Sequence, residues 1–118
     1  MTQLMMVRGK TAEFLLELTF EGEPVVVDPE VELVFTAKRA FSDSNADAII
    51  HKTIDAGITV GTEPGEATVK IEPADTVDLD RRVLLWDVEL VDPDENRYVV
   101  AGGTLHVDPV VSATVLGS

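Results

Sequence analysis

Apolar and polar residues alternate along most of the chain, a pattern typical of strands that bury one face. The first such stretch covers residues 11–20. One face of it carries Ala12, Phe14, Leu16, Leu18 and Phe20, and the other carries Glu13, Leu15, Glu17 and Thr19. We predict a half-buried strand of about ten residues here, ended by the turn residues 21–24.

Further strands are predicted at residues 31–38, 49–54, 58–61, 66–72, 81–90, 97–103 and 104–108, and the alternation is clearest in 31–38, 66–72 and 81–90. Within these stretches the predicted inward positions are Val31, Leu33, Phe35, Ala37, Ala67, Val69, Ile71, Leu84, Trp86, Val88 and Leu90. Turn signals separate the stretches every ~8–12 residues, and no long segment shows a helical period. The spacing predicts an all-β fold, an antiparallel β-sandwich of about eight or nine short strands.

The connections between these strands carry ordinary turn and cap residues. Residues 42–45 form a predicted turn, and residues 46–48 make either one helical turn or the approach to the strand at 49–54, which we favour. Pro73 suits the first turn of a short helical crossing. Two breaks divide the end of the sheet, at residues 92–96 and at Gly102-Gly103.

The length of 118 residues suits one domain with a real core. We assign residues 1–108 to a single sandwich and residues 109–118, PVVSATVLGS, to a C-terminal arm. The arm is apolar and has no clear partner in a monomer's core. The only candidate boundary lies near Pro109.

The charge limits the classes of partner. Nine Lys and Arg oppose 22 Asp and Glu, a formal net charge of −13. Phosphate backbones and anionic membranes repel such a chain, so we expect neither nucleic-acid nor membrane binding. No apolar run approaches the ~20 residues of a membrane span, and the N-terminus does not read as a secretory signal. The absence of Cys excludes disulfides and thiolate metal sites.

The rarest residues are the first candidates for a site. Trp86 falls on an inward face and reads as a core residue, and Tyr98 reads as a partly buried strand residue. His51 and His106 fall opposite their apolar neighbours, so we expect them to face solvent. As a metal pair they would need a third ligand and convergence in space.

Two acidic segments, Asp75–Asp80 and Asp92–Asn96, contain alternating carboxylates. Calcium prefers six to eight oxygens, but neither segment matches the twelve-residue calcium loop. Turn capping by Asp and Asn explains both segments better, although weak calcium binding stays open.

Catalytic motifs are missing. Ser42, Ser44, Ser112 and Ser118 lie in expected loop or arm without a nucleophile elbow, and no phosphate loop or dinucleotide fingerprint occurs. We assign no catalytic, cofactor-binding or metal-binding residue, and we expect no cofactor and no enzymatic activity.

Several segments in order carry a family resemblance: MMVRGKTAEFLLELTF, VELVFTAKRAFSD, AIIHKTIDAGITV, GEATVKIEPADTVDL and LLWDVELVDPDENRYVVAGGTLHV. The chain resembles small immunoglobulin-like domains of tailed phages and prophages, of the type found at the N-terminus of BppU-type upper baseplate proteins. The matching elements fall on Arg8-Gly9, on Lys38, on Gly57 to Thr76 and on Asp87 to Val107. Where that pattern often has a Gly in its last hairpin, this chain has Asp94-Glu95-Asn96.

The resemblance implies an immunoglobulin-like sandwich and a virion-associated structural protein of a tail, baseplate or connector. Its expected partners are other phage structural proteins and further copies of itself, with a location in the virion and, during assembly, the host cytoplasm. The alternative is a carbohydrate- or calcium-binding adhesion-type module. A small hydrolase using Asp or Glu is the third reading and would need a pocket that joins two acids.

Overall fold

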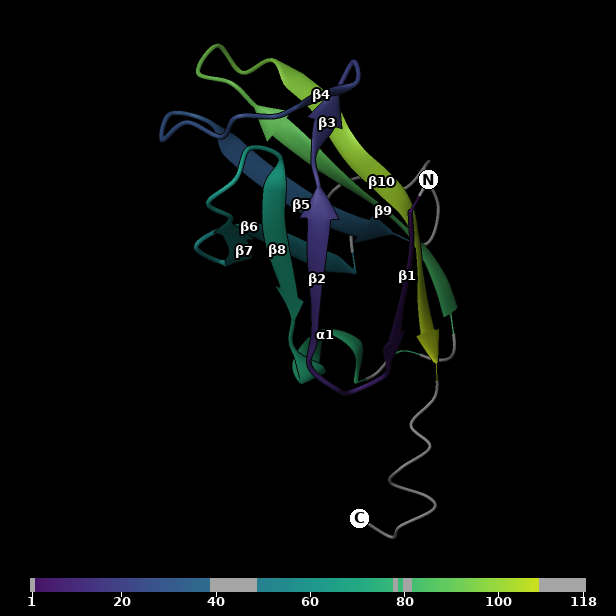
Figure 1. The fold of residues 1–118 in the computed structure, drawn as a ribbon. Coiled ribbons are helices and arrows are strands. Elements are labelled where there is room, and N and C mark those ends of the chain that lie inside the picture. The colour runs from purple at the N-terminus through teal and green to yellow at the C-terminus, as the bar shows by residue number, and fades with distance from the viewer. Residues whose placement is uncertain (1, 39–48, 78, 80–81, 109–118) are drawn as a thin grey trace, which may run out of the picture.

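The computed structural model describes residues 2–38, 49–77, 79 and 82–108. These residues form strands and one short helix, in the order shown in Figure 1. The elements are β1 (Thr2–Val7), β2 (Ala12–Glu17), β3 (Thr19–Phe20), β4 (Glu23–Pro24), β5 (Glu32–Lys38), β6 (Ile50–Ile54), β7 (Gly57–Val60), β8 (Glu66–Ile71), α1 (Pro73–Thr76), β9 (Arg82–Val91) and β10 (Arg97–Asp108).

Eight of these strands form one sheet in the order β1-β10-β9-β5-β6-β7-β8-β2, and β3 and β4 form a separate hairpin. The sheet folds over on itself, so that β1, β10, β9, β5 and β6 form one layer and β7, β8 and β2 form the other (Figure 1). Across the sheet, β10-β9-β5-β6 correspond to strands G-F-C-C′ of an immunoglobulin-like sandwich, and β7-β8-β2 correspond to strands D-E-B. The predicted all-β immunoglobulin-like fold is therefore confirmed.

Two strand pairs are parallel in this otherwise antiparallel sheet. β1 runs parallel to the last six residues of β10, from Thr2 opposite Gly103 to Val7 opposite Asp108. β6 and β7 pair over only two positions, Thr53 with Gly57 and Ile54 with Ile58. This short β6–β7 pairing is the seam where one layer passes into the other.

Gly57 permits the seam to form. Its φ of +115° favours glycine, and a Cβ on it would lie 2.4 Å from Cδ of Lys52. The aliphatic stem of Lys52 therefore packs directly on the Gly57 backbone. The Nζ of Lys52 continues to Asp75 of α1, at 2.7 Å.

The core lies between the two layers and follows the predicted alternation. Leu84, Trp86 and Val88 of β9 are buried, as are Leu33, Phe35 and Ala37 of β5. The rings of Phe35 and Trp86 stack with centroids 5.6 Å apart. The indole N–H of Trp86 donates to the Thr104 carbonyl at 3.0 Å, which satisfies the polar atom of a buried aromatic side chain.

Several predicted elements are confirmed. The strands at β6, β7, β8 and β9 lie where the alternation places them, and β7 and β8 pair as an antiparallel hairpin. Pro73 opens α1, and Asp92–Asn96 is a turn. The predicted turn at residues 42–45 and the arm at 109–118 lie outside the described residues.

Other predictions need correction. Gly102-Gly103 is not a break, because both glycines lie inside the twelve-residue strand β10, which absorbs an irregularity between Val99 and Ala101. The first predicted strand ends at Glu17, and Phe20 is 42 % exposed in the β3–β4 hairpin. No strand was predicted for residues 2–7, where β1 lies.

Across the part of the chain that the structure describes, no helix is long and apolar enough to cross a membrane.

Candidate functional site

The sandwich leaves two strand edges unpaired next to each other. β1 covers only Gly103–Asp108 of β10, so that residues 97–102 have no hydrogen-bonded strand partner on that side within the described chain. β2 is the last strand of its layer and pairs only with β8. Unpaired edges present rows of backbone N–H and C=O groups that another strand can bond.

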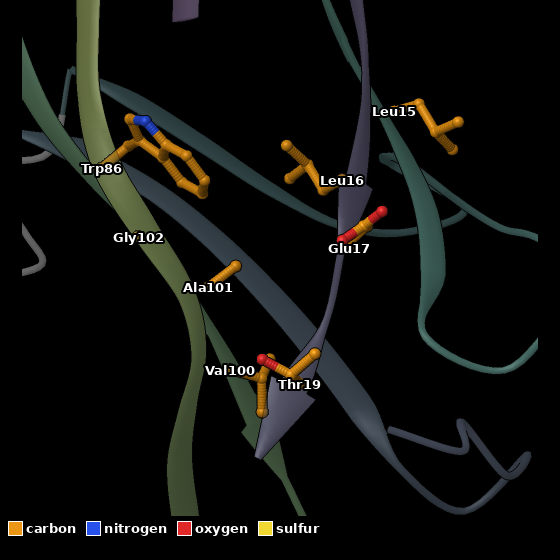
Figure 2. A pocket seen from close by; sticks show the side chains of 8 residues that line it. All are labelled: Leu15, Leu16, Glu17, Thr19, Trp86, Val100, Ala101 and Gly102. Carbon is orange, nitrogen blue, oxygen red and sulfur yellow. The ribbon is translucent and has the colours of Figure 1, made fainter. Parts of the chain in front are cut away.

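A slot of about 460 Å³ lies between these two edges. Leu16, Glu17 and Thr19 line it from the β2 side, and Val100, Ala101 and Gly102 line it from β10 (Figure 2). The buried rings and methyl groups of Trp86, Leu16 and Val100 form its floor. Leu15 is 66 % exposed and points to the other side of β2, as the alternation of a strand requires.

An aromatic contact lies beyond the upper end of the slot, toward the β9–β10 turn. Phe20 of β3 and Tyr98 of β10 meet edge to face, with ring centroids 5.2 Å apart. Tyr98 is 37 % exposed, so it lies nearer the surface than the sequence analysis predicted. The contact ties the β3–β4 hairpin to β10 and so limits the length of the slot.

Most of the residues that line the slot are apolar. Glu17 is the only titratable residue among the eight that line it. Among these eight residues Glu17 has no second acid and no histidine beside it for acid–base chemistry, and Thr19 supplies the one hydroxyl. An apolar floor between two backbone edges instead matches an extended segment that adds to a sheet edge.

The two histidines do not converge. Both lie on the outer face of the β1-β10-β9-β5-β6 layer, His106 on β10 and His51 on β6. Three strand spacings of roughly 4.8 Å separate those strands, which is about 14 Å in total. The expectation that His51 is solvent-facing is confirmed, and His106 is half-buried.

The segment Asp92–Asn96 is a capped turn. The carboxylate of Asp92 accepts hydrogen bonds from the backbone N–H groups of Asn96 and Asp94, at 2.8 and 3.0 Å, and from the Asn96 side-chain amide. The bond from the Asn96 backbone, above all, holds the pKa of Asp92 below its usual value. These bonds already use both carboxylate oxygens of Asp92, as turn capping predicts.

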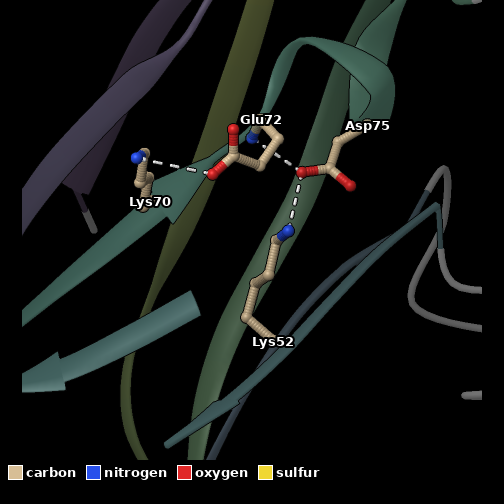
Figure 3. Close-up of polar contacts among 4 residues, drawn as sticks. All are labelled: Lys52, Lys70, Glu72 and Asp75. Carbon is tan, nitrogen blue, oxygen red and sulfur yellow. Dashed lines mark hydrogen bonds and ion pairs between the residues drawn. The ribbon is translucent and has the colours of Figure 1, made fainter. Parts of the chain in front are cut away.

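Asp75 has a comparable structural role in α1. Its Oδ2 accepts from the Glu72 backbone N–H at 2.8 Å and pairs with Nζ of Lys52, while Glu72 faces Lys70 at 3.6 Å (Figure 3). Asp78 and Asp80 of the same segment lie outside the described residues, as do Ser42, Ser44, Ser112 and Ser118. Over the described ranges, no group of three or more His, Asp or Glu side chains is placed to hold a metal ion.

Sequence reasoning missed the slot. Trp86 was predicted as a core residue, and its exposed fraction of 2 % confirms this. Its place beside an open strand edge depends on the pairing of β1 with β10, which begins only at Gly103. The one available signal was Ala101-Gly102-Gly103, three consecutive small residues in a strand whose other side chains are mostly large.

No protein-family model and no curated protein sequence matches this chain. Among solved structures, murine CRIg is similar to it, with a TM-score of 0.44 and 15 % sequence identity over 92 % of each chain. The fold assignment rests on the strand order described above.

Proposed function

We propose that this chain is a structural subunit of a phage or prophage particle, in a tail, baseplate or connector, and that it works through protein–protein contacts. The slot between two unpaired strand edges is the observation that carries the contact role. The resemblance of the sequence to small immunoglobulin-like phage domains supports the proposal that the chain belongs to a phage particle. The proposed location is the virion and, before assembly is complete, the host cytoplasm.

The distribution of charge supports protein partners over nucleic acid. The turns at the upper end of the sandwich carry Glu21, Glu23, Asp28, Glu30, Glu63, Asp92, Asp94 and Glu95. Such an end repels phosphate, and it attracts a surface that presents basic side chains. The proposed role is non-catalytic, in line with the single carboxylate in the slot.

Mass spectrometry of purified particles tests this proposal. Prophage is induced in the source bacterium, and particles are purified through a density gradient. We expect peptides of this chain in the particles at a fixed ratio to the major capsid and tail subunits. Peptides that are abundant in the lysate and missing from the particles would refute the virion role.

A further inference from the structure

We propose that residues 109–118 of one copy bind as an added strand in the slot between β2 and β10 of a second copy, so that copies join head to tail. The inference rests on the proposed contact role and names its partner, a second copy of this chain.

The slot fits one added strand. Among the described residues, Arg97–Gly102 of β10 form no strand pair on the slot side; Val100–Gly102 line the slot, and β3 packs against β10 at Tyr98. The opposite edge, β2, is six residues long. β1 already lies along the lower half of the same β10 edge. A segment placed in the slot would continue the line of β1 upward and cover the floor formed by Trp86, Leu16 and Val100.

The sequence after Asp108 suits this place. Residues 110–116, VVSATVL, contain no charge, no Pro and no Gly, and four of the seven are β-branched. Such segments favour extended structure and pair with open edges. Seven residues match the length of β2, the six-residue edge that they would join.

The geometry of the chain favours exchange between copies. β10 ends at Asp108, at the lower end of the sandwich beside the Arg8 turn, where the Arg8 N–H donates to the Asp108 carbonyl at 2.8 Å. The slot residues of β10, Val100–Gly102, come directly before Gly103, where the pairing with β1 begins. β10 runs from its slot residues, Val100–Gly102, down to Asp108, so the described chain ends at the opposite end of the sandwich from the slot.

The charges favour the same head-to-tail order. Two upper ends, with their eight acidic turn residues, repel each other. The lower end carries both signs of charge: Lys10 and Lys70 are exposed there, and Glu72 lies 3.6 Å from Lys70. It therefore lacks the uniformly acidic turns of the upper end. An interface that repeats from the lower end of one copy to the upper end of the next is heterologous, and it builds a ring or a filament.

The absence of Cys allows a direct test with the purified full-length chain. One preparation carries Thr19→Cys, in the slot, and a second, isotope-labelled preparation carries Ala113→Cys, in the arm. The two are mixed and treated with a short thiol-to-thiol crosslinker. The control replaces Thr19→Cys with Thr59→Cys, an exposed position on the outer face of β7.

We expect mixed dimers, one labelled and one unlabelled chain, at least tenfold more abundant with Thr19→Cys than with Thr59→Cys. An excess of the free peptide PVVSATVLGS should suppress them. Equal yields from both positions would overturn the inference. So would a Thr19→Cys/Ala113→Cys double variant that crosslinks within single chains at low concentration, since the arm would then occupy its own slot.

The outcome is separable from that of the particle experiment. A chain found in particles that gives no mixed dimers keeps the proposed function and loses the arm exchange. A chain that forms mixed dimers and is missing from particles keeps the arm exchange and loses the proposed function.

Discussion

The hydroxyl of Thr36 is enclosed and has no hydrogen-bond partner among the residues that the structure describes. Thr36 is 3 % exposed, on the outer face of β5 between His51 of β6 and Asp87 of β9. A buried polar group that makes no hydrogen bond costs roughly 1–3 kcal/mol of stability. The position therefore favours an apolar side chain of the same shape.

We expect Thr36→Val to raise the free energy of unfolding by about 1 kcal/mol. Chemical denaturation of both proteins measures the change. Thr59→Val, at an exposed position of β7, is the matched control and should change stability by less than about 0.5 kcal/mol. A loss of stability in Thr36→Val would mean that the hydroxyl has a partner.

Asp87, beside Thr36, gives the protein a pH dependence. Burial, and secondarily the charge of Glu89, raise the pKa of Asp87 above its usual value, while Lys38 opposes them. Between the unfolded and folded pKa values the folded state binds more protons, so stability falls as pH rises through that interval. Above it, the charged carboxylate is a net cost to the fold.

Asp87→Asn should therefore be more stable than the parent at pH 7, by up to about 0.5 kcal/mol because solvent screens a half-exposed charge. The difference should vanish below the unfolded pKa of about 3.9. Melting curves of both proteins across this pH range provide the measurement. A variant that is less stable than the parent at pH 7 and equally stable at low pH would show that folding lowers the pKa of Asp87 instead of raising it.

Inward positions such as Leu84 and Val88 were predictable because a period of two fixes the face of every residue in a strand. The burial of Thr36 was not, since enclosure of an outward position depends on neighbours that the strand's own period does not encode. The capping role of Asp92 was predictable for the opposite reason: its partners, Asp94 and Asn96, lie within four residues.

At the scale of elements, the seam between β6 and β7 depends on Gly57. Ala at this position must adopt a φ of +115° and push the Lys52 stem away, which disturbs the pair between Lys52 and Asp75. We expect Gly57→Ala to lower the free energy of unfolding, and Gly22→Ala is the matched control. Gly22 has a φ of +83° and nothing within 4 Å of the added Cβ, so its variant reports backbone strain alone.

The loss in Gly57→Ala should exceed that in Gly22→Ala by roughly 1–3 kcal/mol, the usual range for overpacking. Denaturant titration of the two variants measures the difference. Equal losses would show that the Lys52 stem moves aside at no cost.

Strand prediction succeeded where one face is polar and failed where both faces are apolar. β1 has Leu4 and Met6 buried, but Met5 and Val7 on its other face are apolar too, and this hides the alternation. Gly102-Gly103 predicted a break because glycine weakens isolated strands. Pairing with β9 along both glycines keeps β10 continuous.

At the scale of the molecule, the strand count and the sandwich were accessible from turn spacing, but the pairing of β1 with β10 was not. That pairing joins residues about a hundred positions apart, and no local pattern encodes it. The slot follows from the pairing, because it exists only where β1 stops short of the upper half of β10.

Removal of residues 109–118 should weaken self-association and leave the fold intact, because every described strand ends by Asp108. Sedimentation velocity of the full-length and truncated chains over a concentration series measures the mass. Raised salt should weaken the full-length assembly further by screening its charged ends. An oligomer mass that does not change on truncation would contradict this prediction.

The only Trp of the chain lies beneath the slot, so the protein contains its own optical probe. Trp86 is itself part of the slot floor, and a segment that enters the slot changes the polarity and the quencher access around its indole. Emission wavelength and quenching by a small solute then follow occupancy directly, without a label and without a change in sequence. Followed in time, the same signal gives the rates at which a segment binds in the slot and leaves it. The mass of an assembly does not give these rates.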